Sequence, residues 1–187
     1  MMIEYFITDV DGTLTDGNIY ISKRDAYMKF SKEDGMGFFL LRKAGIKSMI
    51  VTSESTTYKI AKRRAKQVEA DYFYHSTHDK LRLIEDIMVD DNFLNRWGLD
   101  WSRVAYIGDD VNDLPVMSRF ETVEPPMIPM VFCPADANDK VKRLPFMNIC
   151  DKSGGDGAVR EAIEVVLKYN EEMRSVQNGY VKGKDSS

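Results

Sequence analysis

The sequence predicts an α/β fold in which a parallel sheet is flanked by helices. Short apolar runs at residues 3–8, 46–51 and 103–107 have the length of buried strands, and a polar residue follows each run. Segments with apolar residues at helical spacing lie between these runs. Strands that alternate with helices are typical of βαβ units, which build parallel sheets.

Two further strands and three helices complete this expectation. The strands are predicted near residues 130–133 and 146–149, which are short apolar runs. The helices are predicted at about residues 35–44, 78–95 and 155–169, because apolar side chains recur there every three or four positions.

A hairpin interrupts the alternation. Two β-rich runs, IYIS at 19–22 and YMKF at 27–30, surround the polar segment KRDA and predict a hairpin over about 18–31 that projects from the sheet. We expect a single domain over residues 1–170. Residues 171–187 lose apolar periodicity, so we expect a flexible tail there.

Composition and length indicate one soluble globular domain. The chain has 187 residues and a net charge of -4, which gives no indication of binding to nucleic acid or to an anionic membrane. No apolar stretch approaches the roughly 20 residues that span a bilayer, and no signal peptide is visible. Cys133 and Cys150 form no metal motif and are expected to be buried thiols in a reducing compartment, so we expect a cytoplasmic protein.

The segment DVDGTLTDG places two carboxylates, Asp9 and Asp11, one residue apart. Two acids this close repel each other, so a folded protein that keeps both needs a cation or a reaction that uses them. The predicted strands end at Asp9, Thr52 and Asp109, and ligands bind outside the carboxyl ends of parallel strands. Because Mg2+ prefers carboxylate oxygens, the sequence predicts a Mg2+ site that includes Asp9 and Asp109.

The same residues suit phosphoryl transfer. A carboxylate beside Mg2+ can attack phosphorus and form an aspartyl-phosphate, and a second acid can protonate the leaving oxygen and later deprotonate water. Gly12 lets the chain turn and exposes amide groups to an anion. Thr52 offers a hydroxyl to a phosphate oxygen, and Lys80 offers a positive charge.

Four motifs occur in an order that resembles the haloacid dehalogenase superfamily of Rossmann-like α/β enzymes: Asp9-Val-Asp-Gly-Thr, Thr52, Lys80 and Gly108-Asp-Asp-Val-Asn-Asp113. The resemblance implies Asp9 as the nucleophile and Asp11 as the general acid and base. It implies that Thr52 and Lys80 bind the phosphate. It also implies metal ligation by Asp9, the main-chain carbonyl of Asp11, and Asp109.

Two more acids, Asp110 and Asp113, would lie beside this site and orient it. An aspartate at position 11 favours a phosphatase over other chemistries of the superfamily. The structural alternatives are that these acids are solvated loop residues, that Asp113 caps a turn, and that Lys80 is a surface lysine.

A longer resemblance covers most of residues 3–168 and includes the segments DGNIYIS, EDGMGFFLLRKAGI, STHDKL, VAYIGDDVND and SGGDGAVREAIEVVL. It is to a small capless branch that hydrolyses KDO 8-phosphate or nine-carbon 2-keto-3-deoxy sugar-acid 9-phosphates, such as those of KDN and N-acetylneuraminate. A related domain is fused to animal acylneuraminate cytidylyltransferases. The resemblance implies no cap domain and a homotetramer that assembles through the hairpin, in which a neighbouring subunit helps to close the site.

The second motif bears on the substrate, because it reads Thr52-Ser-Glu54. The KDO 8-phosphate enzymes carry a motif that resembles Thr-Gly-Arg, whose arginine can grip a carboxylate, whereas Glu54 would repel it. The nine-carbon phosphatases resemble this chain in their glutamate, so we favour a nine-carbon 9-phosphate and keep KDO 8-phosphate as the alternative. Arg64 of a neighbouring subunit would supply a positive charge to the sugar acid, and Asp34 and Gly35 match a substrate-proximal loop.

These substrate assignments also have structural alternatives. Glu54 would suit a helix N-terminus, where an acid is favoured by the helix dipole. Arg64 could be a solvated side chain, or Arg63 could be the arginine that reaches the substrate. His75 and His78 are expected to be structural or exposed. The chain as a whole could be a non-catalytic assembly domain of the same fold.

Overall fold

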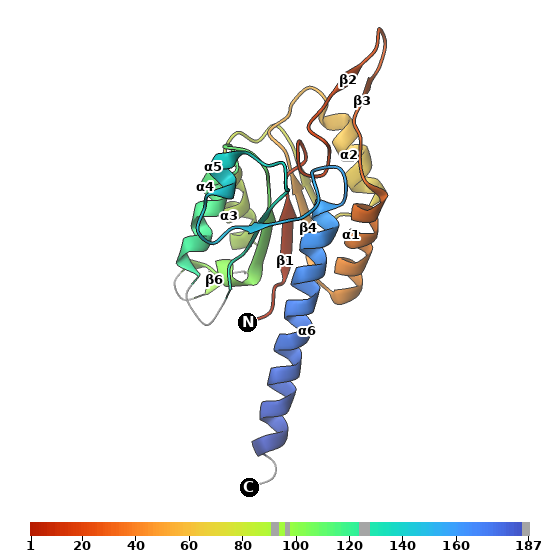
Figure 1. Cartoon of the computed structure of the whole chain (residues 1–187). Coiled ribbons are helices and arrows are strands. Elements are labelled where there is room, and N and C mark those ends of the chain that lie inside the picture. The colour runs from red at the N-terminus through yellow and green to blue at the C-terminus, as the bar shows by residue number, and fades with distance from the viewer. Residues whose placement is uncertain (91–93, 96–97, 124–127, 185–187) are drawn as a thin grey trace.

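The computed structural model describes residues 1–90, 94–95, 98–123 and 128–184. Its centre is a parallel sheet in the strand order β10-β9-β8-β1-β4-β5 (Figure 1), which confirms the predicted fold class. The strands are β1 Tyr5–Thr8, β4 Lys47–Val51, β5 Tyr72–Tyr74, β8 Val104–Ile107, β9 Met130–Cys133 and β10 Asn148–Ile149. Of these strands, only β5 was not predicted; it is a three-residue, half-buried edge strand, too short to show a period.

Helices cover both faces of the sheet (Figure 1). One face carries α1 Lys32–Ala44, α2 Tyr58–Gln67 and α6 Ala158–Lys184, and the other carries α3 Lys80–Asp90, α4 Leu114–Met117 and α5 Asp139–Lys142. The minor elements are the short helices Trp101–Arg103 and Ser118–Thr122 and the two-stranded ribbon of β6 Leu94–Asn95 and β7 Gly98–Leu99.

Side chains of β1 alternate between the two cores, as expected for a strand buried on both sides. Phe6 packs with the α1 and α6 layer, and Tyr5 and Ile7 pack with the α3 and α4 layer. This central position of β1 places the residue that follows it, Asp9, in the middle of the sheet edge.

A two-stranded antiparallel hairpin projects beyond the sheet between β1 and α1 (Figure 1). Its strands are β2 Tyr20–Ile21 and β3 Ala26–Tyr27, and Tyr20 pairs with Tyr27. Residues 9–32 are all described and form no cap domain, so both the hairpin and the capless connection are confirmed.

Two helix ends differ from the expected boundaries. Helix α3 runs to Asp90, and Leu94–Asn95 form strand β6 rather than the last turn of the expected helix; residues 91–93 lie outside the described part. Helix α6 continues through Lys184, beyond the expected end at 169. The apolar periodicity is lost where α6 stops packing against the sheet. The helix itself continues, because its backbone hydrogen bonds are made within the helix.

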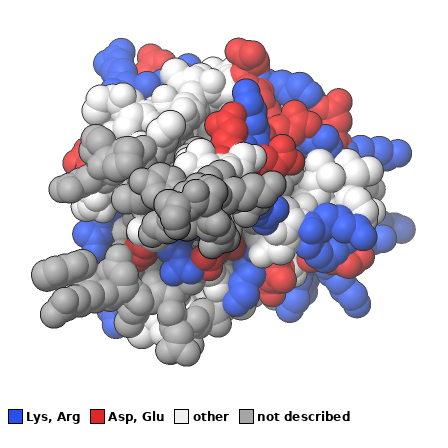
Figure 2. Space-filling view, turned by 90° about the horizontal axis from the view of Figure 1, so that it is seen from below, with Lys and Arg blue, Asp and Glu red and all other residues white. Residues whose placement is uncertain are grey.

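Helix α6 is anchored where it leaves the sheet. The Asn170 side chain accepts a hydrogen bond from Ile3 N (2.7 Å) and donates one to Ile3 O (2.8 Å). Beyond this point the helix extends past the body of the protein (Figure 1). Seen from below, acidic and basic side chains are interspersed on the coloured surface (Figure 2). None of the described helices has the length and apolarity needed to span a bilayer.

Candidate active site

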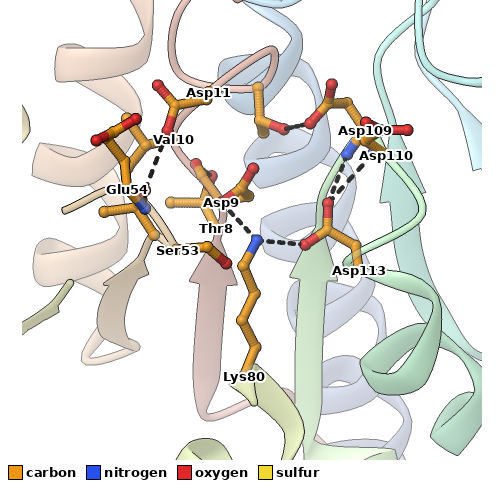
Figure 3. Close-up of polar contacts among 12 residues, drawn as sticks. Thr8, Asp9, Val10, Asp11, Ser53, Glu54, Lys80, Asp109, Asp110 and Asp113 are labelled. Carbon is orange, nitrogen blue, oxygen red and sulfur yellow. Dashed lines mark hydrogen bonds and ion pairs between the residues drawn. The ribbon is translucent and has the colours of Figure 1, made fainter. Parts of the chain in front are cut away.

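A buried lysine joins two carboxylates at the carboxyl edge of the sheet (Figure 3). Lys80 Nζ donates to Asp9 Oδ1 and to Asp113 Oδ1, at 2.6 Å each. All three residues are at most 2% exposed. The fold thus brings together Asp9 and Lys80, which are 71 positions apart in the chain. Because Lys80 is buried, the alternative that it is a surface lysine is excluded.

Asp113 organises the loop after β8. Its Oδ1 also accepts from the Tyr106 hydroxyl (2.7 Å), and its Oδ2 accepts from the amides of Asp109 (3.0 Å) and Asp110 (3.3 Å). With Lys80, four donors occupy the four acceptor positions of this carboxylate. Tyr106 is a site residue that the sequence analysis missed, although a tyrosine in an otherwise apolar strand signals a need for a buried partner.

Asp11 and Asp113 lie on opposite sides of Asp9, and Asp11 contacts the second motif (Figure 3). The Thr52 hydroxyl donates to Asp11 Oδ2 at 3.0 Å and accepts from the Glu54 amide at 3.0 Å. Burial raises the pKa of Asp11; the Thr52 hydrogen bond lowers it and the Glu54 charge raises it. A raised pKa favours the protonated form, which a general acid requires.

Three carboxylates form a candidate metal centre. Among the described residues, ligand oxygens of Asp9, Asp109 and Asp113 lie within 4.8 Å of one another. Burial and the charge of Asp113 raise the pKa of Asp9 well above its ordinary value, although Lys80 lowers it. Burial, Asp113 and Asp110 raise the pKa of Asp109 to about 7. A hard divalent cation would offset this repulsion, and Asp9 and Asp109 are the better ligands because the Asp113 oxygens already have donors.

Close backbone packing holds the metal-site loop. A Cβ on Gly12, whose φ is +80°, would lie 2.0 Å from Asp109 Oδ2, so only glycine fits there. A Cβ on Gly154 would lie 2.0 Å from Gly12 O, and the Gly155 amide donates to Thr13 O at 3.1 Å. The Gly154–Gly155 turn therefore packs directly on the first motif, besides preceding α6.

An open cleft of about 250 Å³ lies over these groups. Ser53 and Asn112, which the sequence analysis did not single out, line it beside the predicted carboxylates. Asp110 also lines the cleft, and its Oδ1 accepts from Asn138 Nδ2 at 3.0 Å. The full described lining is Asp9, Asp11, Gly12, Gly17, Ser53, Asp109, Asp110 and Asn112.

Glu54 has a contact at the start of α2. Its Oε1 accepts from the amides of Thr56 and Thr57, and these bonds to the carboxylate lower its pKa although burial raises it. These bonds join Glu54 to the turn that leads into α2. Glu54 lies on the Asp11 side of the site (Figure 3), and its charge raises the pKa of Asp11.

The other predicted substrate residues contact the start of α1 and of α6 rather than the carboxylate cluster. Arg64 Nη2 donates to Ser31 O at 2.7 Å, and a Cβ on Gly35 would lie 2.9 Å from that nitrogen. Asp34 is 1% exposed, and its Oδ1 accepts from the Arg160 amide (2.9 Å) in the first turn of α6. None of Arg64, Asp34 and Gly35 is among the described residues that line the cleft, so their substrate roles stay predictions.

Comparisons with known proteins place this fold and site. No family model matches the chain. The 3-deoxy-D-manno-octulosonate 8-phosphate phosphatase KdsC of Haemophilus influenzae is 30% identical over 167 residues, which are 89% of this chain and 83% of that protein. A crystal structure of the phosphatase of the same name from Moraxella catarrhalis, in complex with magnesium, phosphate and KDO, has a TM-score of 0.75 at 26% identity and covers 95% of this chain and 93% of that one.

A longer protein also matches. N-acylneuraminate cytidylyltransferase A of Danio rerio is 29% identical over 175 residues, which are 93% of this chain. The chain spans 37% of the length of that relative, so the similarity concerns one part of it.

With these relatives, the parallel sheet, the projecting hairpin and the lysine-bridged carboxylates identify a phosphoric monoester hydrolase of the haloacid dehalogenase superfamily. Within that superfamily, the chain belongs to the capless KdsC-like phosphatase family.

Proposed function

We propose that this protein is a Mg2+-dependent phosphatase that hydrolyses a 2-keto-3-deoxy sugar-acid phosphate through Asp9. The observation that carries the proposal is the buried Lys80 bridge between Asp9 and Asp113, with Asp11 on the other side of Asp9. Burial lowers the pKa of Lys80, but Asp9 and Asp113 more than offset this and raise it above its ordinary value. A permanently charged lysine suits the charge that develops on a transferring phosphoryl group.

Each side chain has a defined task in this mechanism. A carboxylate oxygen of Asp9 attacks phosphorus while the bond from phosphorus to the sugar oxygen breaks. Protonated Asp11 gives its proton to that leaving oxygen. Asp11 then takes a proton from the water that attacks the aspartyl-phosphate, which releases inorganic phosphate and restores Asp9.

The carboxylate centre fits Mg2+, the ion named for the Moraxella catarrhalis structure. Asp9 and Asp109 would hold the ion together with the main-chain carbonyl of Asp11. When bound, it supplies positive charge that keeps the acids ionised and neutralises phosphate oxygens.

The proposed substrate is a nine-carbon 9-phosphate, such as that of KDN or N-acylneuraminate. Glu54 in the second motif supports this choice, because the nine-carbon phosphatases resemble this chain in their glutamate, and a carboxylate at this place accepts hydroxyl or amide hydrogens of the sugar. KDO 8-phosphate is the alternative, because the relatives named for KDO and for N-acylneuraminate match this chain at nearly the same identity.

We also propose a homotetramer assembled through the hairpin. Ile21 is 81% exposed and Tyr27 is 57% exposed, and Ile19 and Tyr20 beside them are exposed as well. An apolar patch of this kind on a projecting element is typical of a protein interface. A neighbouring subunit would then exclude water from a cleft that has no cap domain.

The test is a kinetic panel of eight- and nine-carbon ulosonic acid phosphates and an aryl phosphate, with and without Mg2+. We expect phosphate release that requires Mg2+, a preference for a nine-carbon substrate, and loss of activity in Asp9→Asn. A preference for KDO 8-phosphate would establish the alternative substrate. Release by the wild type no faster than by Asp9→Asn on every substrate would favour a non-catalytic assembly domain.

A further inference from the structure

Two aromatic rings stack between the start of α2 and the end of β5. The rings of Tyr58, the first residue of α2, and His75, which follows β5, have centroids 3.7 Å apart and planes inclined at 12°. Both side chains are half-buried. The stack therefore joins the segment after β4 to the segment after β5 by direct ring contact.

The residue after His75 has an unusual backbone. Ser76 has a φ of +57°, in the left-handed region that non-glycine residues seldom adopt. The Ser76 Oγ lies 2.9 Å from His75 Nδ1 and can donate a hydrogen bond to it in the neutral tautomer with the proton on Nε2. The stacked ring thus lies in contact with a turn whose conformation needs support from its surroundings.

That turn is bonded to the loop that carries the second motif. The Ser76 amide donates to Glu54 O at 3.2 Å, the Ser53 hydroxyl donates to Thr77 O at 2.9 Å, and the Thr77 amide donates to Thr52 O at 3.3 Å. Ser53 lines the cleft, and Glu54 lies on the Asp11 side of it (Figure 3). Contacts made by His75 and Ser76 therefore reach the residues at the cleft mouth.

The catalytic groups have a separate support. The Thr52 amide donates to Tyr74 O at 3.0 Å, where β4 and β5 pair, and Lys80 is held by Asp9 and Asp113. None of these three bonds involves the aromatic stack, although the Thr77 amide also reaches Thr52 through its carbonyl oxygen. A change in the stack should therefore act first on Ser53 and Glu54 and leave Asp9, Lys80 and Asp113 in place.

We propose that the Tyr58–His75 stack is a specificity-determining device that positions Ser53 and Glu54 for the sugar-acid part of the substrate. The inference rests on the proposed phosphatase function and deepens it. Tyr58 and His75 act as positioning residues: they hold the cleft mouth and take no part in the transfer of the phosphoryl group.

The test compares Tyr58→Leu, which removes the stack, with Tyr58→Phe, which keeps it. For the preferred sugar-acid phosphate, we expect Tyr58→Leu to raise KM about tenfold, a difference of about 1.4 kcal/mol, with kcat within about twofold. Its kcat/KM for para-nitrophenyl phosphate, which has no sugar acid, should change less than about twofold. Tyr58→Phe should behave as the wild type in both assays.

A second pair of variants separates the ring from its hydrogen bond. His75→Phe keeps a stacking ring and loses the Ser76 contact, whereas His75→Asn keeps a polar atom and loses the ring. We expect His75→Asn to resemble Tyr58→Leu and His75→Phe to be milder. Thermal unfolding of each variant checks that the assays are run on folded protein.

Three results for Tyr58→Leu would each overturn the specificity role and leave the phosphatase function standing. They are equal losses of kcat/KM on both substrates, a fall in kcat alone, and an unchanged KM in a protein that is thermally destabilised. A wild type that hydrolyses para-nitrophenyl phosphate but no sugar-acid phosphate would overturn both the substrate class and this inference. The two failures are therefore distinguishable.

Discussion

The Tyr106 hydroxyl lies 2.7 Å from Asp113 Oδ1, the same oxygen that accepts a hydrogen bond from Lys80. Both Tyr106 and Asp113 are fully buried. A strand residue outside the four motifs therefore supplies one of the donors that stabilise the carboxylate opposite the predicted nucleophile.

The first prediction concerns this hydroxyl. Tyr106→Phe should lower the free energy of unfolding by about 2 kcal/mol, because a buried carboxylate loses a charge-assisted hydrogen bond. Urea denaturation measures the change. Tyr169→Phe is the matched control, since the Tyr169 hydroxyl is only partly buried and makes no hydrogen bond to a described residue. Equal effects of the two substitutions would contradict the prediction.

Asp34 should make stability depend on pH. Burial raises its pKa to about 6, although the Arg160 amide lowers it, and Oδ2 has no hydrogen-bond partner among the described residues. The ordinary pKa of an aspartate is about 3.9, so the folded protein binds the proton more tightly than the unfolded chain. The stability that protonated Asp34 contributes is therefore present below about pH 4 and is lost as the pH rises to about 6.

Asp34→Asn should remove this dependence. Its amide oxygen can still accept from the Arg160 amide, and no charge has to be buried. At pH 7 the variant should be more stable than the wild type by up to about 3 kcal/mol, and at pH 4 the two should be nearly equal. Urea titrations at both pH values without Mg2+ measure the difference. A constant difference at the two pH values would show that Asp34 does not titrate as expected.

Mg2+ should stabilise the protein through Asp109. At a Mg2+ concentration 100 times the Kd, binding to the folded state adds about 2.7 kcal/mol, so addition of EDTA should lower Tm. Asp109→Asn should lose most of this Mg2+-dependent shift. Asp151→Asn changes an exposed carboxylate outside the cleft and should keep it. Differential scanning fluorimetry reports both, and an equal shift in the two variants would exclude Asp109 as a ligand.

The hairpin should control assembly. Ile21→Glu places a charge on a side chain that is 81% exposed, so it should leave the fold intact and dissociate the proposed tetramer. Ile149→Glu, at a residue that is 51% exposed on β10, is the control. Light scattering gives the mass of each species. A monomeric wild type would refute the assembly proposal directly.

Much of the fold could be predicted from local sequence patterns. The runs before Asp9, Thr52 and Asp109 were predicted to be buried strands. Because ligands bind at the carboxyl ends of parallel strands, these three residues were predicted to lie at one edge of the sheet. Helix ends were less predictable: α6 continues past Asn170 although its apolar stripe ends there, because helix formation does not require a buried face.

Some site residues could not be assigned a role from sequence. In the sequence, Tyr106 resembles the other core residues of an apolar strand. Its role depends on the loop after β8, which places the Asp113 carboxylate next to the Tyr106 hydroxyl. Asp34 matched a substrate-proximal loop, but the fold places its Oδ1 on an amide 126 positions away in α6. The stacked ring of His75 gave no local signal, because its partner lies on a different element.

Most of the segments that form strands, the hairpin, and the identity of the acids, the lysine and the threonine at the sheet edge were determined by the amino-acid sequence itself, since periodicity and motif spacing are local properties. The order of the strands in the sheet was not predicted. Which oxygen each donor reaches, and which acid is left with room for a cation, were decided by tertiary structure alone. The physical reason is that hydrogen bonds and desolvation act over a few ångströms in space, between groups whose separation along the chain carries no information about that distance.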